Sequence, residues 1–296
     1  EVLGLVLANP YRGELSQELD LTSVKPEDKP KEILKKLRFN SKATLIICPN
    51  HLIEQWTEEF KKFTDPPLKI LSMTTIAHLR ASSFEELCNV DVVIFSLQAL
   101  HYANYLSIGK ENLPFTGEAR KPSPRPVRIA KHLQEVRKLI SQGKKLKEPP
   151  LLEFIKWHRI VLDEAHEQLM DEPFQEMFSY FDCRFLWHVS GTPFPSEEAL
   201  QVLLERIGFS WNSGVLQREN WNHTTCLLKH VFADILWNNL CWRNTKESVK
   251  DEYVVPGVVE DLVLLDFTDV EKALYFDLDQ DNKKVLCSKM VQVGNC

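Results

Sequence analysis

The sequence lacks both a long apolar run and a regular cysteine pattern. No segment approaches the roughly 20 consecutive apolar residues of a membrane-spanning helix, and the first residues show no charged stretch followed by an apolar one, as a secretory signal would. The seven cysteines are odd in number, scattered, and include no Cys-x-x-Cys pair. These absences argue against a membrane protein, a disulfide framework and a zinc site, and they predict a reducing compartment.

A glycine-rich phosphate loop of the form Gly-x-x-x-x-Gly-Lys-Ser/Thr is also missing. The two Gly-Lys pairs, at residues 109–110 and 143–144, are followed by Glu111 and Lys145. None of these residues therefore forms a loop whose backbone N–H groups cradle phosphates. Because the first residue is Glu rather than Met, we expect the chain to start inside a longer protein.

The chain contains short apolar stretches that alternate with helical patterns. Buried strands are predicted at four places, residues 44–49, 91–95, 160–162 and 185–189. Between the first two, apolar residues recur every three or four positions and predict a helix over residues 51–63. Strands that alternate with helices predict an α/β fold with a mainly parallel sheet.

Two adjacent acids follow the third of these strands. Asp163 and Glu164 come directly after the apolar run 160–162, and the carboxyl edge of an open parallel sheet is where ligands bind. A carboxylate there can hold Mg²⁺ through water, and Asp163 suits that role. A neighbouring carboxylate can activate water, a contribution of roughly 10²- to 10⁴-fold, and Glu164 suits that one. The alternative is that the acids only begin a helix, whose first turn favours negative charge.

Three further motifs accompany the acids in a fixed order. The first strand ends at Pro49, and the spacing Pro-x-x-Leu-x-x-Gln-Trp-x-x-Glu runs from there to Glu59. The acids begin the sequence Asp-Glu-Ala-His (DEAH) at residues 163–166, and a later strand runs into Ser-Gly-Thr-Pro at residues 190–193. This set resembles the first motor lobe of superfamily two helicases. The spacing from Pro49 resembles the Swi/Snf-type chromatin-remodelling ATPases, some of which carry a RING ubiquitin-ligase module.

The resemblance implies a RecA-like three-layer lobe that binds ATP and Mg²⁺, in a nuclear protein whose partner is double-stranded DNA or chromatin. In such a lobe Asp163 positions Mg²⁺ through water and Glu164 activates the attacking water. The residues implied in communicating the nucleotide state are His166, Ser190, Gly191 and Thr192. Those implied to lie nearer the nucleic acid are Pro49, Asn50, Gln55 and Ser96. The family usually has Thr-Thr-Tyr or Thr-Ser-Tyr where this chain has Phe-Ser-Leu at residues 95–97.

A basic insert interrupts the predicted lobe at residues 101–150. Residues 119–147 contain ten Lys or Arg against one acid, Glu135, so that this segment carries +9 and the remainder of the chain −15. The insert is a candidate site for a polyanion, with a helix predicted over residues 127–141. Its candidate nucleic-acid contacts are Arg120, Lys121, Arg125 and Arg128. A solvated surface insertion and a nuclear-targeting patch are the alternatives.

Two domains are predicted, with a boundary near residue 240. Residues 1–240 correspond to the first lobe, which we expect to begin just after its phosphate loop. Residues 241–296 correspond to the linker and the opening elements of a second lobe, because Cys-Trp-Arg-Asn-Thr-Lys at 241–246 resembles the passage between lobes. We expect the motifs of the second lobe to lie outside the chain, so that these residues alone do not hydrolyse ATP.

The implied function is that of an ATP-dependent translocase on double-stranded DNA, in chromatin remodelling or DNA repair. The main alternative is a degenerate motor lobe that binds protein partners as a scaffold or as part of a ubiquitin ligase. A helicase that unwinds RNA or single strands is a third possibility, disfavoured by the Gln55-Trp56 signature.

Overall fold

The computed structural model describes two compact units separately, residues 1–222 and residues 223–296. The residues described are 1–13, 15, 24–25, 27–101, 105, 125–144, 150–168, 171–192, 196, 202–203, 238, 241–244 and 266–272. The predicted start of a second lobe lies mostly outside them, as do Arg120 and Lys121. Within the described part of the chain, no helix is long and apolar enough to cross a membrane.

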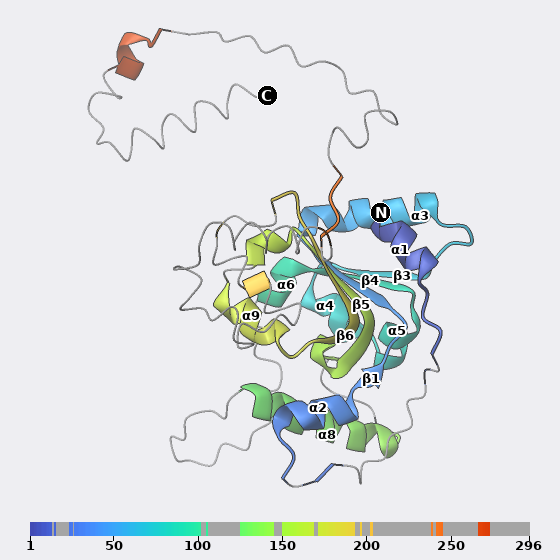
Figure 1. Cartoon of the computed structure of the whole chain (residues 1–296). Helices are drawn as coiled ribbons and strands as arrows, with labels where there is room; N and C mark the ends of the chain where they lie inside the picture. The colour runs from blue at the N-terminus through green and yellow to red at the C-terminus, as the bar shows by residue number, and fades with distance from the viewer. Residues whose placement is uncertain are drawn as a thin grey trace, which may run out of the picture. The chain divides into compact units, whose positions relative to one another are not determined.

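Six strands of the first unit form one sheet in which every pair is parallel (Figure 1). The strands are β1 (Phe39–Asn40), β2 (Thr44–Cys48), β3 (Ile70–Met73), β4 (Val92–Ser96), β5 (Ile155–Asp163) and β6 (Asp182–Val189). Their order is β6-β5-β2-β4-β3, with the short β1 lying beside the start of β5. The predicted parallel sheet is therefore confirmed.

Helices cover both faces of this sheet. They are α1 (Val2–Ala8), α2 (Pro30–Leu37), η2 (Asn50–Leu52), α3 (Ile53–Phe63), α4 (Ile76–Ala81), α5 (Phe84–Asn89), α6 (Leu97–His101), α8 (Arg125–Ser141), η3 (Leu152–Phe154), η4 (Ala165–Gln168) and α9 (Glu172–Phe178). The helix predicted within the basic insert is thus present as α8. Connections through helices are what parallel neighbours require, because a tight hairpin cannot join them.

The alternation of side chains along each strand divides the core into two clusters. In β2, Ile46 and Cys48 belong to a cluster that includes residues of α1 and α3. Leu45 and Ile47 belong to the other cluster, together with residues of α2, α4, α5, α6, α8 and α9. All five residues of β2 and of β4 are buried, which explains why both strands are almost wholly apolar. The result is a three-layer α/β arrangement.

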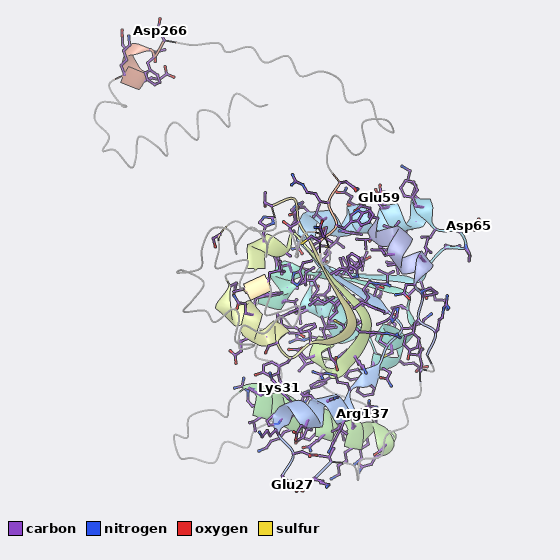
Figure 2. The ribbon with its side chains drawn as sticks, in the orientation of Figure 1. Glu27, Lys31, Glu59, Asp65, Arg137 and Asp266 are labelled. Atoms are coloured by element: carbon purple, nitrogen blue, oxygen red, sulfur yellow. The ribbon has the colours of Figure 1, made fainter. Side chains whose placement is uncertain are left out.

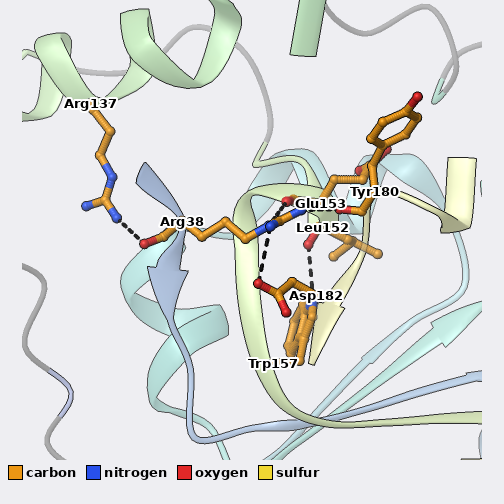
Figure 3. A network of polar contacts seen from close by, with 7 residues as sticks. All are labelled: Arg38, Arg137, Leu152, Glu153, Trp157, Tyr180 and Asp182. Carbon is orange, nitrogen blue, oxygen red and sulfur yellow. Dashed lines mark hydrogen bonds and ion pairs between the residues drawn. The ribbon is translucent and has the colours of Figure 1, made fainter. Parts of the chain in front are cut away.

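Arg38, a largely buried arginine, ties three segments together at the amino end of the sheet (Figure 3). Arg38, which precedes β1, donates from Nε to the carbonyl oxygen of Glu153 at 3.0 Å and also donates to that of Tyr180. Its Nη1 lies 3.2 Å from Oδ2 of Asp182, the first residue of β6. Burial lowers the pKa of the Arg38 guanidinium, and the charge of Asp182 counteracts that effect. These contacts fix where β1, β5 and β6 begin.

The substitution Ile46→Ala is expected to lower the free energy of unfolding by about 2–5 kcal/mol, because Ile46 is 0% exposed and the change leaves a cavity in the sheet. The matched control is Glu58→Ala, at an exposed position of α3, which should change it by less than about 0.5 kcal/mol. Urea unfolding followed by circular dichroism measures both. Equal effects of the two substitutions would contradict the described core.

Candidate functional site

The carboxyl ends of four parallel strands meet at one edge of the sheet. In the register of the sheet Asp163 of β5 is level with Val189 of β6, and Cys48 of β2 is level with Ser96 of β4. Residues that follow these ends therefore lie beside one another although they are far apart in the sequence. Helix α3 lies close to this end of the sheet in Figure 1.

Two hydrogen bonds orient the carboxylate of Asp163. The indole Nε1 of Trp56, on α3, donates to Oδ2 at 2.7 Å. The backbone N–H of Glu164 donates to Oδ1 at 3.0 Å. An ionised carboxylate accepts about four hydrogen bonds, so that Asp163 retains lone pairs for further ligands. Its position is held from α3 on one side and from its own turn on the other.

Glu164 adopts a left-handed backbone conformation, with φ of 51°. For a residue other than glycine this conformation costs about 1–3 kcal/mol. The hydrogen bond from its N–H to Asp163 stabilises the turn. A helix start alone does not require a left-handed residue, although η4 does follow at Ala165. The side chain of Glu164 is 37% exposed, so that its carboxylate is accessible to solvent.

His166 connects the acids with the segment after β6. Its Nδ1 lies 3.3 Å from Oε2 of Glu164 and 2.7 Å from Oγ of Ser190. The backbone N–H of Thr192 donates to the same Ser190 Oγ at 3.0 Å. The structure thus brings Asp163, Glu164, His166 and Ser190 together, with Thr192 attached through its backbone. Gly191 lies between the last two in the chain and is exposed.

The residues expected nearer nucleic acid divide into exposed and buried ones. Asn50 and Gln55 are exposed, and the backbone N–H of Asn50 donates to Oε1 of Gln98 at 2.9 Å. Pro49 is buried. Ser96 is 0% exposed, and its Oγ accepts a hydrogen bond from the N–H of Ala99, so that its hydroxyl is already used at the start of α6.

The basic insert does not share this edge. Arg125 and Arg128 belong to α8, which packs against α2 near the amino end of the sheet (Figure 1). Arg128 is half-buried. The structure therefore places these two residues apart from Asp163.

Sequence reasoning missed two polar contacts at the site. The sequence pattern predicts Trp56 as an apolar position of an amphipathic helix. Its periodicity does not indicate that Nε1–H donates a hydrogen bond to Asp163. Buried indole groups usually find an acceptor, and that tendency was the available signal. The contact between Gln98 and the backbone of Asn50 joins residues 48 positions apart, and no local pattern predicts it.

The donor set at this edge fits Mg²⁺ better than a metal that prefers nitrogen or sulfur ligands. Mg²⁺ is commonly held by one or two carboxylates together with phosphates and water, and Asp163 and Glu164 supply such carboxylates. Burial raises the pKa of the nearby Cys48 to about 12, with a smaller contribution from the charge of Asp163, so that its thiol stays protonated. Among the described residues no group of three His, Cys, Asp or Glu side chains is arranged to hold a metal by itself.

Comparison with known proteins identifies the family. The model of the SNF2-related domain matches residues 16–295. The chain therefore belongs to the SNF2-related domain family, and its sheet with helices on both faces is the RecA-like lobe expected of such a protein.

The curated relatives include E3 ubiquitin-protein ligase SHPRH from Mus musculus and from Homo sapiens. Both are 25% identical to this chain, over 247 and 250 residues, and each match covers 80% of the chain. The chain spans only 13% of the length of either relative.

Two solved structures are among those that match this chain. The Sulfolobus solfataricus SWI2/SNF2 ATPase core in complex with double-stranded DNA is 15% identical, with a TM-score of 0.40, over 69% of this chain and 34% of that one. The Pyrococcus furiosus Hef helicase domain is 12% identical, with a TM-score of 0.20, over 64% of this chain and 38% of that one.

A double-mutant cycle tests the contact between Trp56 and Asp163. Trp56→Phe and Asp163→Ala are expected to couple by about 1 kcal/mol, since a hydrogen bond to a charged group contributes about 1.5–3 kcal/mol and partial exposure reduces it. Trp157→Phe is the control, because its Nε1 donates to the carbonyl oxygen of Leu152 instead. The measurement is urea unfolding of the single and double variants. Additive effects in both cycles would contradict the described contact.

Proposed function

We propose that the chain is the first motor lobe of an ATP-dependent translocase on double-stranded DNA, acting in the nucleus. The observation that supports this most is the arrangement at the carboxyl edge. There Asp163 and Glu164 lie within one hydrogen-bonded group with His166 and Ser190, in a chain of the SNF2-related domain family. Family membership points to ATP and Mg²⁺ as the ligands of this edge.

Each residue at the edge has a part in this proposal. Asp163 would hold Mg²⁺ through water, and the ion would supply positive charge that stabilises the phosphates. Glu164 accepts a proton from the attacking water, for which its exposed carboxylate is suited. The left-handed turn at Glu164 fixes the direction in which that carboxylate leaves the strand.

The path from Glu164 through His166 to Ser190 connects the acids with the segment after β6. The contact of 2.7 Å between His166 and Ser190 means that a shift of either residue displaces the other. Under this proposal the position of the segment that contains Ser190, Gly191 and Thr192 depends on which nucleotide is bound. A movement there passes the change on to the parts of the protein that hold DNA.

The DNA-facing side of the proposal rests on α3 and the turn before it. Asn50 and Gln55 are exposed near the carboxyl edge, where side-chain amides can contact phosphates without reading sequence. Trp56 lies next to Gln55 and donates to Asp163. A displacement of α3 by DNA would therefore reach the carboxylate that holds the metal.

A second candidate function comes from the named relatives. Two of them are E3 ubiquitin-protein ligases, and the match covers 80% of this chain. Under this alternative the lobe belongs to a ubiquitin ligase and binds protein partners, with or without turnover of ATP. The adjacent acids Asp163 and Glu164 favour the motor, because a scaffold has no chemical need for this pair.

ATP hydrolysis by the intact protein, with and without double-stranded DNA, tests the proposal. Glu164→Gln is expected to lower DNA-stimulated turnover by roughly 10²-fold or more, since it removes the base that activates water. Glu85→Gln, at an exposed position of α5, is the matched control and should leave turnover unchanged. Absence of turnover in the intact protein under both conditions would refute the motor and leave a binding lobe.

A further inference from the structure

Helices α2 and α8 pack together at the amino end of the sheet although about 100 residues separate them in the sequence (Figures 1 and 2). Arg137 of α8 donates from Nε to the carbonyl oxygen of Leu37 and from Nη2 to that of Arg38, both at 2.7 Å. Its guanidinium carbon lies 3.3 Å from the centroid of the Phe39 ring. These contacts satisfy carbonyl groups at the end of α2 and fix the two helices to each other. We call residues 27–38 and 125–144 together the basic layer.

The apolar faces of both helices join one core cluster. Leu34 and Leu37 of α2, and Ile129, Leu133 and Val136 of α8, are all buried within it. Because one face of each helix is committed to the core, the exposed residues of the basic layer point away from it. Packing against the core therefore determines which side chains of the layer are exposed to solvent.

This outer surface is strongly positive. The whole basic layer contains eleven Lys and Arg against four Asp and Glu, a net charge of +7 in a chain whose net charge is −6. Arg38 and Arg137 belong to this count but are bound inward, so that the outer charge comes mainly from lysines. The exposed lysines of the layer include Lys29, Lys31, Lys35, Lys131, Lys138 and Lys144.

The acids of the basic layer offset only part of this charge. They are Glu27, Asp28, Glu32 and Glu135. Oδ2 of Asp28 lies 2.6 Å from Nζ of Lys36, and Oε2 of Glu32 accepts a hydrogen bond from the backbone N–H of Lys29. Two of the four acids are thus engaged within the layer itself.

We infer that the basic layer binds the phosphate backbone of double-stranded DNA, as a second contact surface distinct from the carboxyl edge. Lysine is depleted in protein–protein interfaces, whereas sequence-independent contact with phosphates is made mainly by lysine and arginine. The described residues of the layer include no exposed aromatic side chain on which an unpaired base could stack, which favours a duplex over a single strand. The 17 residues of α8 extend about 25 Å, the length of roughly seven base pairs.

The position of the layer separates this inference from the proposed function. Residues of β5 rise about 3.3 Å each, so that its nine-residue length places Ile155, near the layer, about 26 Å from Asp163. A duplex on the basic layer therefore does not occupy the carboxyl edge. Such a surface would keep the protein bound to the same DNA, or to a second duplex, while nucleotide is bound, hydrolysed and released at the carboxyl edge.

The test measures binding of a fluorescently labelled DNA duplex by fluorescence anisotropy at several salt concentrations. In the variant Lys31→Gln/Lys35→Gln/Lys138→Gln, the slope of log K against log salt concentration should fall by roughly 2.7, about 0.9 for each lost phosphate contact, and binding at low salt should weaken about tenfold or more. An unchanged melting temperature of the variant establishes that it is folded. No duplex binding by the chain, or an unchanged slope, would overturn the inference.

The control Arg12→Gln/Lys69→Gln/Arg80→Gln removes the same charge from exposed positions outside both the basic layer and α3, and it should bind as the unaltered chain does. Equal losses in the two triple variants would show a diffuse electrostatic effect and overturn a specific surface. A polyglutamate peptide that binds with the same dependence on the layer, while the duplex does not, would assign it to an acidic protein instead. Glu164→Gln should keep full duplex binding. The triple variant of the basic layer, in the intact protein, should keep DNA-independent ATP hydrolysis. The motor function and DNA binding by the basic layer can therefore fail independently.

Discussion

Burial of the central strands on both faces is the constraint on which the rest of the structure depends. Because β2 and β4 are fully buried, they can carry only apolar or small side chains, and polar groups must gather where the strands begin and end. The carboxyl ends receive Asp163 and the segment at Ser190, and the amino ends receive Arg38 with its partners. One sheet thereby separates two polar regions by the length of its longest strand.

At the carboxyl edge, a single carboxylate is shared between a helix and a turn. Trp56 holds one oxygen of Asp163 and the backbone of Glu164 holds the other, so that α3 and the strained turn depend on each other. His166 then links the turn to the segment after β6. A change of ligand at this edge would therefore displace both α3 and Ser190. Coupling between a ligand site and distant parts of a motor lobe requires such connected movements.

The main strands and the position of the candidate site were predictable from the sequence, because local patterns of apolar and polar residues determine local structure. The apolar runs at residues 44–49 and 185–189 predicted strands, which are present as β2 and β6, and the acids after 160–162 predicted a candidate site at the carboxyl edge. The contacts of Trp56 with Asp163, and of Arg137 with the end of α2, join distant segments, and no periodicity reveals them. Resemblance also placed Ser96 near nucleic acid, whereas its hydroxyl is buried and bonded to a backbone N–H.

The most direct measurement is a structure of the intact protein with Mg²⁺ and a non-hydrolysable ATP analogue. In that structure we expect the ion at the carboxyl edge, joined to Asp163 through water, and Glu164 facing the water beside the terminal phosphate. Nucleotide bound away from this edge would contradict the account, as would an ion that makes no contact with Asp163 directly or through water. Either result would mean that the acids at the end of β5 serve only the fold.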